Sequence, residues 1–393
     1  MRFSQNPREP GFYSDPQPLY RRLRGEPGPW FWEEYGFPVF ARHAEVSALL
    51  RDRRFGRQVL HLTTRAALGW AERPSHLADF DALERHSLLE LEPPDHTRLR
   101  GLVNRTFVSR ALDRLTPDIE ALAERLIDGF ASRGEVEVLE AFATPLAVGV
   151  IAALIGAPAE AAPRLLDWSH AMVAMYRLAP TRAQEDSAAV AARDFARFVR
   201  ELIVARRRAP RGDLISQLIE TDRLSDDERV STVVLLLNAG HEATVHSLGL
   251  AVKTMLDHGL SDAPDEAGIE ELLRFESPLH LFTRFALEDV EVGGVRLKQG
   301  DRIGLLLGAA NRDPEAFSDP DRLDFSRNPN PHVAFGAGIH FCVGAPLARR
   351  EMRIGLNALF RRLPGLALRG RPRWRDAYHF HGLEALKVRW STA

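Results

Sequence analysis

The sequence predicts a mainly α-helical fold with small β-sheets, formed by a single domain over residues 1–393. Three observations support this prediction. Helical patterns fill most of the segment from about residue 94 to residue 259, and one of these helices is unusually long. The strand-like segments are short and lie outside that segment. No linker, internal repeat or low-complexity tract divides the chain.

The first ninety residues combine short elements. Two short helical patterns enclose an aromatic, strand-like segment with a turn at 33–36, and a longer irregular stretch follows. In chain order these segments are 16–24, 30–40, 44–51 and 57–92. The helices that follow are expected to break where glycine and proline occur, near 134, 156–158, 180 and 210–212.

The long helix is the best marked element of the chain. It begins at 225–228, where Ser-Asp-Asp-Glu forms a capping box with two further acids for the helix dipole, and Gly259 ends it. A helix of this length spans about 50 Å. Its centre at 233–237 is apolar on every side, so we expect it to pass through the protein interior.

The remainder of the chain mixes both element types. A helix is predicted at 265–275 and another at 346–363, where the apolar residues follow the helical spacing. Between them lie strand segments at 285–297 and 302–307 and a long irregular segment, rich in proline, asparagine and aspartate, at 311–333. A terminal β-hairpin is expected at 382–388.

Charge and composition argue against several partners. The formal net charge is −2 and the pI is about 6.7, so nothing global indicates binding to nucleic acid or to an anionic membrane. The N-terminus has no apolar segment of the kind found in secretory signals, and no apolar run is long enough to span a bilayer. We therefore expect a cytoplasmic protein with no membrane partner.

The single cysteine, Cys342, stands in an unusual loop. Gly336 and Gly338 allow a tight turn before it, Gly344 leaves room beside its sulfur, and Pro346 opens a helix. Free N–H groups and the positive dipole at a helix start stabilise a thiolate, and an iron ligand of this kind favours cleavage of an O–O bond. The alternative is a buried structural cysteine that follows a glycine turn.

The loop resembles the haem-binding loop of the cytochrome P450 family, whose pattern is Phe-x-x-Gly-x-His/Arg-x-Cys-x-Gly. The matching residues are Phe335, Gly338, His340, Cys342 and Gly344. The resemblance implies a triangular, mostly helical fold, with the long central helix over one haem b. It also implies that Cys342 is the iron ligand, that Phe335 and Gly336 lie beside the haem, and that one oxygen atom from O2 is inserted into a small organic substrate.

Other segments agree with this resemblance. Glu271 and Arg274 match a buried Glu-x-x-Arg pair of the family, and the segment 319–324 resembles the family's meander, so Arg322 is expected to complete the pair. We interpret this trio as structural support for the haem loop rather than as part of catalysis.

Four residues match positions at which the family contacts the haem propionates. His96 and Arg100 lie four residues apart and so share one helical face. Arg284 and His340 match the other two positions, and charge-assisted hydrogen bonds of this kind are strong when they are partly buried. For each residue the alternative is an ordinary surface charge.

The long helix departs from the family pattern at one position. The small residues Ala239 and Gly240 leave room for oxygen, and Glu242 supplies the acid of the pattern. Ala243 stands where the family usually has a threonine whose hydroxyl relays protons, and Thr244 follows it. Glu242, Ala243 and Thr244 are the predicted catalytic group.

Three explanations for Ala243 remain open. Thr244 substitutes for the missing hydroxyl, or a water held by Glu242 or a hydroxyl of the substrate carries the proton, or peroxide is the true oxidant. We favour the second. His241 and His246 are interpreted as structural, since nothing nearby in the sequence completes a second metal site.

The substrate pocket is expected to be mostly apolar. The resemblance places four residues in its wall: Ala239, Leu279, His280 and Phe282. The aromatic and methionine side chains of 168–176 belong either to this wall or to the core.

The electron donor has to come from outside, because the chain has no room for a fused flavin domain. We expect a monomer that receives electrons from a ferredoxin-type donor and its reductase. A basic patch is expected to dock this donor through Arg98, Arg105, Arg349, Arg350 and Arg353. The alternative functions are a peroxide-driven peroxygenase and a non-catalytic haem protein that binds a ligand.

Overall fold

The computed structural model describes residues 1–107, 109–176 and 179–392. Its contacts divide the chain into two compact units. Unit 1 comprises Met1–Leu62, Ala123–Ala143 and Ala243–Ala393, and unit 2 comprises Thr63–Leu122 and Thr144–Glu242. The single-domain interpretation remains a prediction.

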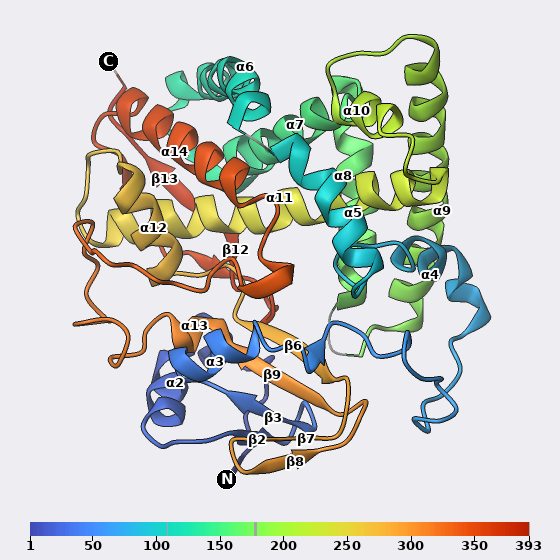
Figure 1. The fold of residues 1–393 in the computed structure, drawn as a ribbon. Helices are drawn as coiled ribbons and strands as arrows, with labels where there is room; N and C mark the ends of the chain where they lie inside the picture. Colours follow the sequence, from blue (N-terminus) through green and yellow to red (C-terminus); the bar gives the residue numbers. More distant parts are fainter. Residues whose placement is uncertain (108, 177–178, 393) are drawn as a thin grey trace. The chain divides into compact units, whose positions relative to one another are not determined.

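The largest sheet belongs to unit 1, and its strands β2, β3, β9 and β6 lie side by side in Figure 1. In spatial order the strands are β1 (Arg2–Phe3), β2 (Trp30–Trp32), β3 (Phe37–Phe40), β9 (Arg302–Leu306), β6 (Leu281–Ala286) and β4 (Phe55–Gly56). β6 and β9 pair antiparallel, with Arg284 opposite Ile303. β6 carries Phe282, which contacts the cysteine loop at Gly336.

Two hydrophobic clusters pack against this sheet. One contains Phe40, Ile303 and Leu305, and the other contains Trp32 and Val39, all of them buried. Burial of such side chains contributes about 1.5–3 kcal/mol each. The sheet is therefore a rigid base for the residues at its ends.

The helices of unit 1 are α1 (Pro10–Ser14), α2 (Gln17–Arg24), α3 (His43–Leu49), α12 (Glu266–Phe275), α13 (Leu307–Ala310) and α14 (Ala345–Arg362). Four of them, α2, α3, α12 and α14, confirm predicted helices, whereas the short α1 and α13 were not predicted. Asp265 caps α12 by accepting a hydrogen bond of 2.9 Å from the Gly268 N–H. The irregular segment predicted at 311–333 contains neither helix nor strand in the described structure.

Unit 2 is helical. Its helices are α4 (Ala78–Glu84), α5 (Asp95–Asn104), α7 (Thr144–Ile155), α8 (Ala162–Val173), α9 (Arg182–Arg208) and α10 (Leu214–Glu220). α6 (Ser109–Asp128) and α11 (Asp226–Asp257) begin in unit 2 and continue into unit 1. The four predicted breaks lie between α6 and α7, α7 and α8, α8 and α9, and α9 and α10, whereas the end of α5 at Asn104 was not predicted.

The long helix α11, labelled in Figure 1, confirms its prediction at both ends. The Ser225 hydroxyl accepts from the Glu228 N–H at 3.2 Å, and the Glu228 carboxylate accepts from the Ser225 N–H at 2.8 Å. Gly259 follows the helix with a φ of +67°, a conformation that favours glycine. Val233, Val234 and Leu237 are buried, as expected for an interior helix.

The predicted terminal hairpin is wrong. β12 (Leu383–Ala385) pairs with β11 (Arg373–Trp374), whereas β13 (Lys387–Arg389) pairs with β10 (Ala367–Leu368) and β5 (Glu135–Glu137). Only Leu386 separates β12 from β13, which is less than the two residues of the tightest common hairpin turn. The hairpin in this half of the chain is instead β7 (Val290–Val292) with β8 (Val295–Leu297). In the described parts of the chain, every helix is too short or too polar to cross a membrane.

Candidate functional site

The cysteine loop of unit 1 is closed by its own backbone. The Cys342 N–H donates to the Phe335 carbonyl at 3.0 Å, and α14 begins three residues after the cysteine. Cys342 is exposed, and a side chain at Gly344 would begin only 3.9 Å from its sulfur. The sulfur is therefore accessible, beside a helix start that favours its thiolate form.

The turn before the cysteine requires glycine at two positions. Gly336 and Gly338 have φ values of +70° and +72°, in the left-handed region that other residues rarely adopt. A Cβ at Gly336 would lie 3.1 Å from the Phe282 ring, and one at Gly338 would lie 2.4 Å from the Leu50 carbonyl oxygen. The loop thus packs tightly on β6 and on the segment that follows α3.

The loop that carries Cys342 exposes large apolar side chains close to it in sequence. Ile339 and Phe341 are each 38% exposed, although both are large and hydrophobic. Phe341 meets Phe335 edge to face at a centroid distance of 6.2 Å, and the Arg349 guanidinium lies 4.5 Å from the Phe335 ring centre. Exposed apolar side chains in the loop of a thiolate are what a flat, hydrophobic metal porphyrin would cover, so these residues fit a haem.

The predicted propionate contacts are divided between the two units. In unit 1, Arg284 is buried on β6 and donates to the Thr283 carbonyl at 2.9 Å, and His340 is half-buried in the cysteine loop. A buried guanidinium is suited to an anionic partner. In unit 2, α5 carries His96, which is buried, and Arg100, which donates to the Asn104 side chain at 2.9 Å. Contact of these four residues with one haem remains a prediction.

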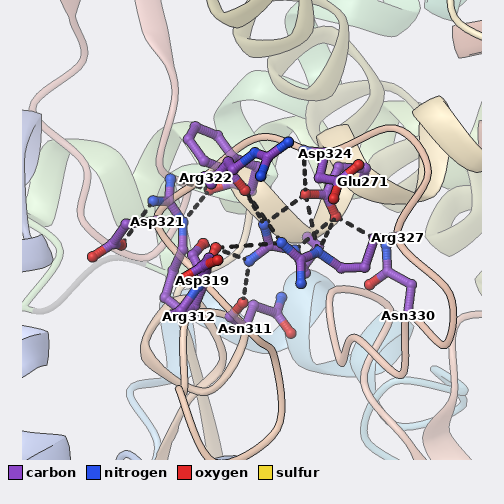
Figure 2. A network of polar contacts seen from close by, with 12 residues as sticks. Glu271, Asn311, Arg312, Asp319, Asp321, Arg322, Asp324, Arg327 and Asn330 are labelled. Carbon is purple, nitrogen blue, oxygen red and sulfur yellow. Dashed lines mark hydrogen bonds and ion pairs between the residues drawn. The ribbon is translucent and has the colours of Figure 1, made fainter.

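The Glu-x-x-Arg pair is buried, but its third member differs from the expectation. Arg274 donates to both oxygens of Glu271 at 2.7 and 2.8 Å, and Figure 2 shows Arg327 reaching the same carboxylate. Arg327 Nε lies 3.1 and 3.2 Å from the Glu271 oxygens. The prediction of Arg322 is wrong: its backbone carbonyl accepts hydrogen bonds from Arg274 and Arg327, while its side chain is exposed. Burial raises the pKa of Glu271, but the Arg274 and Arg327 guanidinium groups lower it by more, so that it lies below its usual value.

The predicted catalytic group occupies consecutive positions of α11. Ala239 is exposed within an otherwise largely buried helix, whereas Glu242 is 3% exposed and Thr244 is also buried. Ala243 is half-buried and has no polar side-chain atom. Ala239, Glu242 and Ala243 therefore lie on one continuous helix, and the acid among them is buried.

Two histidines border Glu242 in unit 2. His241 Nε2 lies 3.4 Å and His170 Nε2 lies 3.6 Å from Glu242 Oε2. His170 comes from α8, and sequence reasoning missed it because 72 residues of chain separate it from Glu242. The expectation that nothing completes a second cluster of metal-binding side chains is wrong in this respect.

Three of the predicted pocket residues lie in unit 1. Leu279 and Phe282 are half-buried. His280 is buried instead among aromatic side chains: its Nδ1 lies 2.8 Å from the Tyr20 hydroxyl, and its ring stacks on His381 at 4.2 Å. Burial lowers the pKa of His280 well below its usual value, so the ring is neutral. These contacts support a structural role for His280, and its place in the pocket remains a prediction.

The comparisons with known proteins agree with this geometry. A model of the cytochrome P450 family matches residues 266–367. The chain is 37% identical over 357 residues to a biotin biosynthesis cytochrome P450 of Bacillus subtilis, with 88% of each chain covered. It is 37% identical over 318 residues to a 6-deoxyerythronolide B hydroxylase of Saccharopolyspora erythraea, with 76% of each covered.

Solved structures extend the likeness to the whole fold. The structure of P450BioI in complex with an acyl carrier protein that bears hexadec-9Z-enoic acid matches with a TM-score of 0.90 and 34% identity. It covers 97% of this chain and 100% of that chain. The predicted fold class and haem b cofactor are confirmed by these relatives. The chain therefore belongs to the cytochrome P450 family and is a haem-thiolate monooxygenase.

Proposed function

We propose that Cys342 is the axial ligand of the haem iron and that the enzyme oxidises a small, mostly apolar organic substrate. The observation that carries this proposal is the exposed Cys342 sulfur in a glycine-constrained loop that also exposes large apolar side chains. When bound through a thiolate, haem supplies the activation of oxygen. Phe335, Gly336, Arg284 and His340 would hold it from unit 1, and His96 and Arg100 from unit 2.

We further propose that Glu242 delivers protons during oxygen activation. Its carboxylate is buried, as a proton donor in a water-excluded site should be, and the half-exposed His170 lies 3.6 Å from it. Ala243 offers no hydroxyl, so the last transfer would use a water held by Glu242 or a hydroxyl of the substrate itself. Thr244 is the alternative donor.

The coupling ratio tests this assignment. Product formed per reduced cofactor consumed is measured for the parent enzyme, Glu242→Gln and Thr244→Ala, with Ala243→Thr as a gain-of-hydroxyl control. We expect Glu242→Gln to lower coupling strongly, because a positioned general acid contributes about 10²- to 10⁴-fold to the step that it serves. Thr244→Ala should change it little, and Ala243→Thr should keep or raise it. If Thr244→Ala abolished coupling while Glu242→Gln did not, the proton would come from Thr244. Turnover driven by peroxide alone would favour a peroxygenase.

The electron donor is proposed to be an acidic ferredoxin-type protein that docks on arginines, of which Arg349, Arg350 and Arg353 lie on α14, the helix that follows the cysteine loop. Two of the five predicted arginines are partly neutralised: Arg98 pairs with Glu228, and Arg349 pairs with Glu270. Arg105 is exposed and Arg353 of α14 is half-buried, and Arg350 is the fifth member of the proposed surface. We expect the reduction rate to fall with ionic strength and to fall further in Arg353→Glu. A rate independent of ionic strength would refute this docking surface. A monomeric state and a cytoplasmic location remain part of the proposal.

A further inference from the structure

Three side chains of unit 2 converge on one point beside the proposed proton donor. His170 on α8 and His241 and Glu242 on α11 each direct one potential ligand atom there, and these atoms all lie within 4.8 Å of one another. The Nε2–Oε2 distances are 3.4 Å from His241 and 3.6 Å from His170. His241 and Glu242 are 1% and 3% exposed, while the His170 side chain is 49% exposed. The cluster is therefore buried on one side and open on the other.

The hydrogen bonds of His241 indicate its tautomer, that is, which ring nitrogen carries the hydrogen. Its Nδ1 lies 3.2 Å from the Leu237 carbonyl oxygen, which only accepts, and 3.4 Å from the Ser169 hydroxyl, which can accept or donate. The shorter contact, with the carbonyl, favours the tautomer in which Nδ1 carries the hydrogen. In the neutral ring, Nε2 then has a lone pair. Among the residues that the structure describes, this buried Nε2 has no hydrogen-bond partner, and the polar atom beside it at 3.4 Å is a carboxylate oxygen, which is also an acceptor.

Two acceptor atoms that face each other in a buried site need either a shared proton or a metal ion between them. The distances in this cluster favour a metal ion. Zn²⁺ binds histidine nitrogen and carboxylate oxygen at about 2.0–2.2 Å in tetrahedral sites, which places neighbouring ligand atoms about 3.3–3.6 Å apart. The two separations from Glu242 Oε2, 3.4 and 3.6 Å, match this spacing, and the two histidine nitrogens lie within 4.8 Å of each other. A histidine that donates its other N–H to a backbone carbonyl is also the usual arrangement of a metal ligand.

We propose that His170, His241 and Glu242 form a second metal site, for Zn²⁺ or a similar divalent transition metal. Three protein ligands would leave the fourth position to water, on the side where His170 is exposed. The consequence rests on the proposed function: a metal on Glu242 withdraws the carboxylate from proton delivery. Zn²⁺ is then an inhibitor that uncouples the enzyme, without acting on the Cys342 ligand.

Binding is tested on the tag-free, haem-loaded enzyme without turnover. Zn²⁺ is titrated calorimetrically into the parent, His170→Gln and Glu242→Gln, and into His61→Gln as a control, since His61 is an exposed histidine of unit 1. His170→Gln suits the test because the His170 side chain is 49% exposed, so that the substitution disturbs the core less than one at the buried His241. We expect one equivalent of Zn²⁺ in the parent and the control, and an affinity at least about 10-fold weaker in the two cluster variants. X-ray absorption at the zinc edge should show one imidazole ligand fewer in His170→Gln than in the parent.

The outcomes separate the two proposals. Binding that is absent in the parent, or equal in all four proteins, overturns the metal site and leaves a proton between His241 and Glu242. If Zn²⁺ binds through the cluster but leaves the coupling ratio unchanged, the metal site is supported and the role of Glu242 in proton delivery is refuted. If Zn²⁺ binds and uncouples the parent but not His170→Gln, both are supported.

Discussion

Replacing Arg327 with alanine is the substitution that most directly tests the support of the cysteine loop. Arg327 gives two hydrogen bonds to the fully buried Glu271 carboxylate, and its other nitrogens donate to the backbone carbonyls of the irregular segment, Ser318 at 2.7 Å among them. The Arg327 side chain is itself 9% exposed. Removing it leaves Glu271 with Arg274 but without its second cation.

The expected cost follows from these contacts. Hydrogen bonds to charged groups contribute about 1.5–3 kcal/mol each, and breaking a buried ion pair costs about 3–5 kcal/mol when one partner is left alone. Glu271 keeps Arg274, so we expect Arg327→Ala to lower the free energy of unfolding by about 3 kcal/mol. Arg322→Ala is the matched control in the same segment, and because its side chain is exposed we expect a change within about 0.5 kcal/mol.

The assay is urea unfolding followed by far-UV circular dichroism, with haem release recorded in parallel. A pH series adds a second signature. The pKa of Glu271 lies below its usual 4.5 in the folded protein, so the ionised carboxylate stabilises the fold above that pH and loses this contribution as the pH falls. The difference between parent and Arg327→Ala should therefore shrink on acidification. A loss of stability in Arg322→Ala as large as that in Arg327→Ala would refute the reasoning.

Three further predictions concern the cysteine loop and its neighbours. Gly338→Ala should destabilise the fold by about 2 kcal/mol more than Gly294→Ala in the same unfolding assay, because both carry a positive φ but only Gly338 lacks space for a Cβ. Burial raises the pKa of Glu351 well above its usual value, so the parent should lose stability relative to Glu351→Gln as the pH rises above about 4.5; a constant difference would contradict this. Burial raises the pKa of Glu270, but Arg349 and His332 together lower it to about 2. The ionised Glu270 carboxylate should therefore add to the free energy of unfolding down to about pH 4.5, and this contribution should disappear towards pH 2. Acid unfolding of Glu270→Gln and of the parent would show the difference.

The sequence predicted those features that depend on local chemistry. The capping box of α11, the glycines of the cysteine loop and the breaks between helices all follow from residues close together in the chain. Ala243 was visible for the same reason, because it interrupts a short motif.

Contacts between distant segments were not predictable in this way. Arg322 and Arg327 both lie in an irregular segment with no periodicity, so nothing local indicates which side chain turns inward to Glu271. His170 meets Glu242 only because α8 and α11 pack in unit 2, and His280 meets Tyr20 across 260 residues. Glu351 follows Cys342 by nine residues, and only its burial shows that it is unusual.

The visible spectrum of the reduced, carbon-monoxide-bound protein tests the central claim most directly. We predict the strongly red-shifted main absorption band of thiolate ligation in the parent, and its loss in Cys342→Ala. Protein that stays colourless when supplied with haemin, or a Cys342→Ala variant that keeps the thiolate-type band, would contradict the assignment of Cys342 as the iron ligand.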